Sequence, residues 1–227
     1  MKERIVVLTG AGISADSGLK TFRDSDGLWE GHRVEDVATP EAFARNPQLV
    51  LDFYNERRRQ LLAAQPNAAH HALVELAKHY EVRIVTQNVD DLHERAGSQQ
   101  VLHLHGELTK LRSTVDEDHV VDWFEDQTLE HRDPNGHLMR PHIVWFGESV
   151  PLIETAADWV SMADKVLIIG TSMKVYPANG LIQCARPGAA CYLVDPRPPT
   201  VSGVTTIAAT AAEGVPPLVA ELIAEAR

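Results

Sequence analysis

The 227-residue chain contains four short, almost wholly apolar runs rich in β-branched residues, each followed at once by glycine or polar residues: 5–8, 83–85, 166–169 and 191–194. Such runs are typical of strands that are buried on both faces of a parallel sheet. Segments with the character of helices lie between them, at 47–64, 67–79, 151–162 and 215–226. Strands that alternate with helices predict an α/β fold, with a Rossmann-like parallel sheet.

One stretch interrupts this alternation. Residues 110–140 are polar and acidic and include the turn sequence Asp133-Pro134-Asn135-Gly136. Since this is too long for an ordinary loop, we expect a small lobe inserted into a single domain. Approximate boundaries are 1–29, 76–106 and 145–227 for the Rossmann-like part, and 30–75 and 107–144 for the lobe.

Composition excludes several classes of protein. The formal net charge of −11 disfavours binding to nucleic acid and suits a cationic partner, such as a lysine-bearing peptide. No apolar run approaches the ~20 residues of a membrane span, so no membrane partner is expected. Two cysteines are too few for a disulfide scaffold or a Cys₄ zinc site, which favours a cytoplasmic protein.

A glycine-rich sequence, Gly10-Ala11-Gly12-Ile13-Ser14-Ala15, follows the first run. It is a variant of the dinucleotide-binding fingerprint, in which glycines allow backbone N–H groups to approach a pyrophosphate. The alternative is a glycine turn that binds nothing. Its position directly after a buried strand favours the binding interpretation.

Three further strand ends carry polar groups: Gly170-Thr171-Ser172, Asp195, and residues 86–93 with Gln87, Asn88 and Asp90. Each could be simple turn or helix-cap chemistry. An acidic residue such as Asp195 can instead accept the hydroxyls of a ribose. Because ligands of open α/β sheets bind outside the carboxyl ends of the strands, we expect these groups to form one site.

Two histidines, His103 and His105, alternate on what we expect to be a short strand and would share one face. Histidine is the side chain best suited to proton transfer near neutral pH, although most histidines are structural or lie on the surface. His105, before a glycine at the strand end, is the best candidate for a general base.

Six collinear segments resemble the motifs of the sirtuin family: 10–29, 66–73, 86–97, 103–108, 141–148 and 170–178. The resemblance implies a sirtuin, DHS-like NAD-binding fold, with a small lobe beside the Rossmann-like domain. It implies an enzyme that removes acyl groups from protein lysines, transfers them to ADP-ribose and releases nicotinamide. NAD is then the co-substrate, and an acyl-lysine protein or peptide the partner.

The resemblance also implies roles for individual residues. His105 would be the base, and Asn88 and Asp90 would orient the ribose and nicotinamide. A β-strand of the substrate would pair with the segment Val144, Trp145, Phe146, Gly147 and Glu148. The expected NAD-binding residues are Gly10, Ala11, Gly12, Ala15, Phe22, Arg23, Trp29, Gln87, Asn88, Asp90, Gly170, Thr171, Ser172, Asp195 and Ala211.

The chain departs from the family at the zinc site. Ser113 stands where the family usually has its first cysteine, and both cysteines, Cys184 and Cys191, lie outside the lobe. We therefore expect no metal. We expect packing of Trp123, Phe124 and Leu129 to hold the lobe, together with acidic groups paired to Arg132 or Arg140.

Tyr54 and Arg57 lie three residues apart on a predicted helix and so share a face. A guanidinium and a phenol can together bind a carboxylate. The same Y-x-x-R pattern marks the sirtuins that accept succinyl- and malonyl-lysine. The alternative is a solvated basic face, because Arg58 and Arg59 follow. We favour an acidic-acyl pocket.

Other functions remain open. The same pocket could serve an NAD hydrolase or ADP-ribosyltransferase, and a catalytically silent, NAD-responsive binding module is a further alternative. A dehydrogenase would fit the Rossmann pattern but not the full set of motifs. We expect a monomer.

Overall fold

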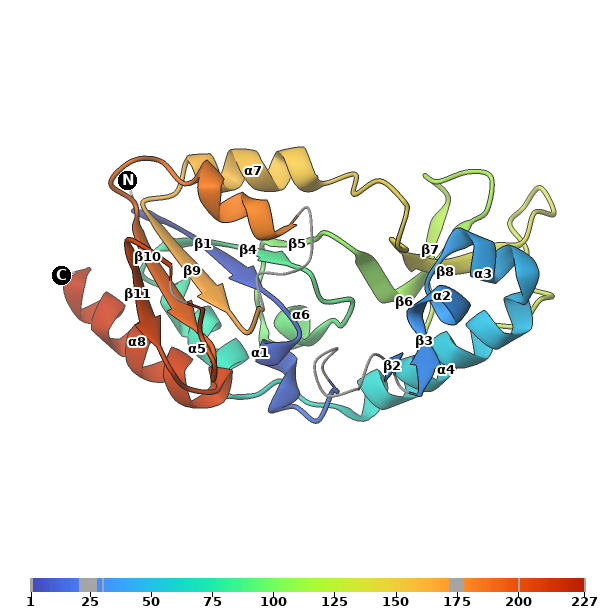
Figure 1. Cartoon of the computed structure of the whole chain (residues 1–227), viewed down its shortest axis with the longest axis horizontal. Coiled ribbons are helices and arrows are strands. Elements are labelled where there is room, and N and C mark those ends of the chain that lie inside the picture. The colour runs from blue at the N-terminus through green and yellow to red at the C-terminus, as the bar shows by residue number, and fades with distance from the viewer. Residues whose placement is uncertain (1, 21–27, 30, 172–177, 200, 227) are drawn as a thin grey trace.

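The computed structural model describes residues 2–20, 28–29, 31–171, 178–199 and 201–226, and its main sheet has six parallel strands in the order β11-β10-β9-β1-β4-β5 (Figure 1). These are β1 (Arg4–Thr9), β4 (Glu81–Thr86), β5 (Val101–His103), β9 (Lys165–Ile169), β10 (Ala190–Val194) and β11 (Val204–Ile207). The four apolar runs of the sequence are β1, β4, β9 and β10. The predicted parallel sheet is therefore confirmed.

Helices cover both faces of this sheet (Figure 1). One face packs on α5 (Ala68–Leu76), α8 (Ala211–Glu225) and the short α1 (Gly12–Ala15), and the other on α7 (Ile153–Ser161) and the 3₁₀ helix η1 (Ala178–Cys184). In β1, Ile5 and Val7 face the first layer and Val6 and Leu8 the second. Burial of both faces explains why the strand sequences are continuously apolar.

A smaller lobe lies beyond one end of the sheet (Figure 1). It contains β2 (Leu28–Trp29), β3 (His32–Arg33), α2 (Val34–Val37), α3 (Pro40–Arg45) and α4 (Pro47–Ala63). It also contains an antiparallel sheet in the order β7-β6-β8, built from β6 (Gly106–Ser113), β7 (Val120–Asp122) and β8 (Met139–Ile143). The polar insertion of the sequence is thus a folded sheet rather than a loop.

Helix α4 begins where the sequence predicts, since Asn46 Oδ1 accepts from the backbone N–H of Leu49 at 3.2 Å. Helix α5 ends at Leu76 rather than at His79, where the chain turns instead. The buried Leu73 and Leu76 belong to the core on the main sheet.

Helix α8 begins at Ala211, before the predicted start at Val215, and carries Pro216 and Pro217 inside it. The N–H of Gly214 donates to the carbonyl of Thr210 at 2.9 Å, so the helix is established before the prolines. The helix therefore starts four residues before the predicted start. Within the described residues, no helix combines the length and apolar character needed to cross a bilayer.

The predicted core of the lobe was also wrong in part. The side chain of Phe124 is 54% exposed, and Trp123 is only half-buried, packed against the ring of His131. Arg132 is exposed, and Arg140 pairs with Glu148, which lies outside the acidic insertion. The core comes instead from helices and strand ends, with members that include Val50, Phe53, Leu61, Leu108 and Ile143. Most of these core residues are far in the sequence from the polar insertion, so the insertion alone does not predict them.

Candidate functional site

Two glycine turns touch at the carboxyl ends of β1 and β9. The N–H of Gly12 donates to the carbonyl of Gly170 at 2.8 Å, and the N–H of Gly10 to that of Ile169 at 3.0 Å. A Cβ on Gly12 would lie 2.6 Å from the Cα of Gly170, whose φ is +61°. Only glycine permits this contact. The strand order reverses between β1 and β9, which is where open α/β sheets bind ligands.

A buried polar cluster lies beside these turns, formed by Ser14, Asn88 and Asp90. Asn88 Nδ2 donates to the carbonyl of Gly10 at 3.1 Å and to Ser14 Oγ at 3.2 Å. Ser14 Oγ in turn donates to Asp90 Oδ2 at 2.9 Å. Burial raises the pKa of Asp90, and the Ser14 hydrogen bond opposes this rise. The predicted residues Asn88 and Asp90 are therefore brought together.

Sequence reasoning assigned no role to Ser14. The only indication in the sequence was a hydroxyl group inside the glycine motif. In the structure Ser14 is 2% exposed. A buried hydroxyl needs partners, and both of its partners are the predicted orienting residues.

His105 lies against the backbone of Gln87. The His105 Nδ1 atom is 3.0 Å from the carbonyl oxygen of Gln87. Since a carbonyl can only accept, Nδ1 carries the proton and Nε2 keeps a lone pair. Burial lowers the pKa of His105, although the hydrogen bond to Gln87 acts in the opposite direction. The neutral imidazole can therefore accept a proton at neutral pH.

His103 has a different environment. Strand β5 ends at His103 and His105 lies in the following turn, so the alternation predicted for the two was wrong. His103 Nδ1 is 3.1 Å from the carbonyl oxygen of Asn88, and Nε2 is 2.9 Å from Glu94 Oε1. Burial lowers the pKa of His103, but Glu94 outweighs burial and the net shift is upward. His103 thus braces the backbone of Asn88.

Among the other predicted NAD residues, Gln87, Thr171 and Asp195 follow the carboxyl ends of β4, β9 and β10. Gln87 Nε2 donates to Thr171 Oγ1 at 3.3 Å, and Asp195 is buried with Oδ1 accepting from the N–H of Arg197 at 2.9 Å. Ala11 and Ala15 are exposed, whereas the methyl of Ala211 is buried in the core. Phe22, Arg23 and Ser172 lie outside the described residues, as does the side chain of Trp29.

Tyr54 and Arg57 lie on α4, where the sequence predicts them. Tyr54 is fully buried, and its oxygen accepts from Trp145 Nε1 at 2.9 Å. Arg57 is half-buried, with its guanidinium 5.6 Å from the centre of the Phe53 ring. Burial raises the pKa of Tyr54 to about 12, even though Arg57 acts to lower it. A protonated phenol and a guanidinium are thus near one another.

Segment 144–148 joins the base to this pair. The N–H of Val144 donates to the carbonyl of His105 at 2.9 Å, and that of Phe146 to the carbonyl of Ala38 at 3.0 Å. The N–H of Trp145 donates to Glu148 Oε2 at 2.7 Å, and the N–H of Glu148 to the carbonyl of Trp145 at 3.1 Å. These four donors are therefore engaged within the chain. A peptide strand would have to pair mainly with carbonyl groups.

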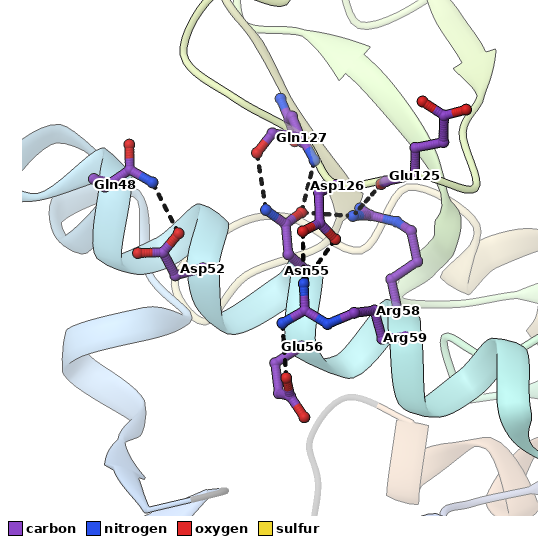
Figure 2. Close-up of polar contacts among 9 residues, drawn as sticks. All are labelled: Gln48, Asp52, Asn55, Glu56, Arg58, Arg59, Glu125, Asp126 and Gln127. Atoms are coloured by element: carbon purple, nitrogen blue, oxygen red, sulfur yellow. Dashed lines mark hydrogen bonds and ion pairs between the residues drawn. The ribbon is translucent and has the colours of Figure 1, made fainter.

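Figure 2 shows how α4 is attached to segment 125–127 of the lobe. Asn55 and Gln127 exchange two hydrogen bonds, from Asn55 Nδ2 to the carbonyl of Gln127 at 2.9 Å and from the N–H of Gln127 to Asn55 Oδ1 at 2.8 Å. Arg58 donates to Asn55 Oδ1 at 2.8 Å and to the carbonyl of Glu125 at 3.2 Å (Figure 2). It also donates to the carbonyl of Leu108 at 2.9 Å. These bonds fix the helix that carries Tyr54 and Arg57.

Arg58 is 1% exposed and forms no ion pair within the part of the chain that the structure describes. Burial lowers the pKa of Arg58 to about 10, and the nearby Asp126 counters this effect. The neighbouring Arg59, by contrast, is exposed and pairs with Glu56 and Asp126. A buried guanidinium bonded to backbone carbonyls therefore has a structural role.

Comparison with known proteins gives a consistent result. The model of the Sir2 family matches residues 10–177. An NAD-dependent protein deacylase of Aggregatibacter actinomycetemcomitans is 63% identical over 200 residues, which cover 88% of this chain and 96% of the relative. A crystal structure of a Sir2 homologue in complex with NAD superimposes with a TM-score of 0.90 at 37% identity, covering 100% of this chain and 91% of that one. A Sir2 structure with a p53 peptide and NAD⁺ gives 0.81 at 27% identity, covering 99% and 93%.

Proposed function

The chain belongs to the Sir2 family, and we propose that, as an NAD-dependent protein deacylase, it removes succinyl and malonyl groups as well as acetyl groups from lysine side chains. The observation that carries the acyl class is the buried hydroxyl of Tyr54 beside Arg57 on one face of α4. An acetyl group is uncharged and needs no cation beside Tyr54. A succinyl or malonyl group ends in a carboxylate, which a guanidinium can bind.

The edge of the main sheet fits NAD. The contact between Gly12 and Gly170 leaves the backbone there without side chains, and the buried Asn88 and Asp90 supply polar groups beside it. NAD would supply the ribose that accepts the acyl group, with nicotinamide as the leaving group. The other NAD-binding residues predicted from the sequence, which include Ala11 and Ala211, remain part of this proposal.

His105 would act as the general base. Its Nε2 lone pair can take a proton from a hydroxyl, while the Nδ1–H bond to Gln87 holds the ring. Asn88 and Asp90, joined through Ser14, would orient the ribose and nicotinamide end. Polar contacts between these residues and the ligand are stronger in a site that excludes bulk water.

The acyl group would extend to α4. The Arg57 guanidinium can bind a carboxylate through two parallel N–H bonds, and the Tyr54 hydroxyl can donate a third hydrogen bond. Because Tyr54 stays protonated at physiological pH, it is a donor whenever substrate binds. The helix that carries both side chains is held in place by the hydrogen bonds of Asn55 and Arg58.

The substrate would be a lysine-bearing protein or peptide that pairs with the carbonyl groups of segment 144–148. The net charge of −11 favours the approach of a cationic chain. We further propose a monomer in the cytoplasm that binds neither nucleic acid nor membrane. Both cysteines are free thiols, in line with a reducing compartment.

The lobe does not fit the zinc ion found in most of the family. In the described ranges no group of three or more histidine, cysteine or acidic side chains could hold a metal. Ser113 instead donates through Oγ to Asp133 Oδ2 at 2.7 Å, and the N–H groups of Asn135 and His137 donate to Asp133 Oδ1, each at 2.9 Å. His137 Nδ1 lies 3.1 Å from Oδ2. We propose that this carboxylate joins the chain segments that zinc would otherwise join.

The acyl preference is tested with the substitution Arg57→Met, measured on matched succinyl- and acetyl-lysine peptides with NAD. Arg59→Met is the control, because Arg59 is a surface residue one position further along. We expect Arg57→Met to reduce desuccinylation at least about tenfold more than deacetylation, as for loss of a charge-assisted bond. Equal losses on both peptides would refute the acidic-acyl pocket. Release of nicotinamide without any peptide would instead indicate an NAD hydrolase.

A further inference from the structure

The Tyr54 hydroxyl has a fixed hydrogen-bond donor, the indole of Trp145. Trp145 Nε1 lies 2.9 Å from Tyr54 Oη, and the two side chains are 3% and 0% exposed. An indole N–H can only donate, so the phenol oxygen is the acceptor in this bond.

The proton of Tyr54 is therefore left for another partner. A phenol O–H lies in the plane of its ring, on one side or the other of the oxygen, and the Trp145 N–H takes one of these sides. Among the residues that the structure describes, none accepts the Tyr54 proton. A buried donor without an acceptor costs free energy, which a ligand carboxylate would recover.

Trp145 is held firmly in this position. The Arg140 guanidinium lies 3.3 Å from the centre of a Trp145 ring, and it donates to Glu148 Oε1 at 2.6 Å and Oε2 at 3.0 Å. Glu148 Oε2 also accepts from the backbone N–H of Trp145. The indole of Trp145 is therefore restrained by its stacking on Arg140, by the ion pair of Arg140 with Glu148, and by its backbone hydrogen bond to Glu148.

We propose that Trp145 is a specificity-determining positioning residue, whose indole N–H occupies one side of the Tyr54 oxygen and so directs the hydroxyl proton toward the carboxylate of a succinyl or malonyl group. The inference rests on the proposed acyl preference. It adds that the segment facing the peptide backbone also sets the geometry of the acyl pocket. Glu148, predicted as a substrate contact, has its carboxylate committed to this support.

The test compares Trp145→Phe, Tyr54→Phe and the double variant, with kcat and KM measured on succinyl- and acetyl-lysine peptides. Phenylalanine keeps an aromatic ring and lacks the N–H. We expect Trp145→Phe to lower the succinyl-to-acetyl ratio of kcat/KM about fivefold, the size of one neutral hydrogen bond, through a higher KM for the succinyl peptide. If Trp145 acts through Tyr54, the double variant has the same ratio as Tyr54→Phe.

An unchanged ratio in Trp145→Phe, or a double variant reduced by the product of both effects, would overturn the inference. The proposed function would survive either result, provided that Arg57→Met and Tyr54→Phe still lose selectivity. If neither of these two variants loses selectivity, the proposed acyl class fails and the inference with it. Should Trp145→Phe not fold, 3-benzothienylalanine at position 145 keeps the shape of the indole without the N–H and must give the same loss.

Discussion

The Nδ1 atom of His105 lies 3.0 Å from the carbonyl oxygen of Gln87, and this contact decides which ring nitrogen of the histidine is free. The carbonyl can only accept, so Nε2 is the basic atom. Gln87 also reaches Thr171 through its side chain. One residue therefore orients the base and touches the second glycine turn.

The first prediction concerns pH. His105 must be neutral to accept a proton, and burial lowers its pKa below the ordinary value of about 6.5. We expect kcat/KM to rise with pH to a midpoint below about 6.5 and to stay level through neutrality. His105→Ala should lower activity at least about 100-fold and remove this limb. A midpoint above the ordinary histidine value would contradict the account.

A second prediction concerns the contact of the two glycine turns. In Gly12→Ala the new Cβ would lie 2.6 Å from backbone atoms of Gly170, so one of the turns must shift. We expect NAD affinity, measured by calorimetry, to fall at least about tenfold. Gly180→Ala is the matched control, because a Cβ there meets none of the described residues within 4 Å. Equal affinity in both variants would argue against a binding role for this edge.

A third prediction concerns the lobe. Burial acts to raise the pKa of Asp133, but hydrogen bonds from Ser113 and from the N–H of His137 outweigh it and hold the pKa well below its usual range. The folded pKa is thus depressed, so the stabilisation is present above the unfolded value of about 3.9 and is lost as pH falls below it.

Asp133→Asn should therefore lower the thermal midpoint at pH 7 and weaken the loss of stability below about pH 4. The exposed Asp118 gives the control, Asp118→Asn. A chelator should leave the midpoint of the unsubstituted protein unchanged. One zinc ion per chain by metal analysis, or a large effect of the chelator, would refute the metal-free lobe.

A fourth prediction concerns the attachment of α4. Asn55→Ala removes the acceptor of the Gln127 N–H and of Arg58, leaving buried donors unpaired. We expect a loss of about 2 kcal/mol in the free energy of unfolding, measured with urea. The exposed Gln48, which bonds only to Asp52 in Figure 2, gives the control Gln48→Ala, expected within about 0.5 kcal/mol. The same loss in both variants would refute the structural role of Asn55.

The sequence predicted the features that depend on local order. Continuous apolar runs such as 166–169 identified buried parallel strands, and the polar groups after them met at one edge, as with Gly12 and Gly170. Asn46 and Asn67 marked the starts of two helices because the capping interaction spans only a few residues. Parallel strands place their carboxyl ends together, which makes such a site predictable.

The features that the sequence did not predict depend on partners far apart in the chain. The bond between Trp145 and Tyr54 joins residues 91 positions apart, and Asn55 meets Gln127 across 72. No hydrophobic periodicity in the sequence indicates which distant residues pair in this way. His105 was placed on a strand because alternation continues past the point where β5 ends. Asp133 was noted only as part of a turn, although its carboxylate accepts hydrogen bonds from Ser113 and from the N–H of His137.

The most direct test of the central claim is nicotinamide release, followed together with peptide masses, from NAD and a succinyl-lysine peptide. A matched acetyl peptide, a reaction without peptide and the His105→Ala variant run alongside. The account predicts release that requires peptide, equals the loss of succinyl groups and disappears in His105→Ala. Release at the same rate without peptide, or none with either peptide, would contradict it.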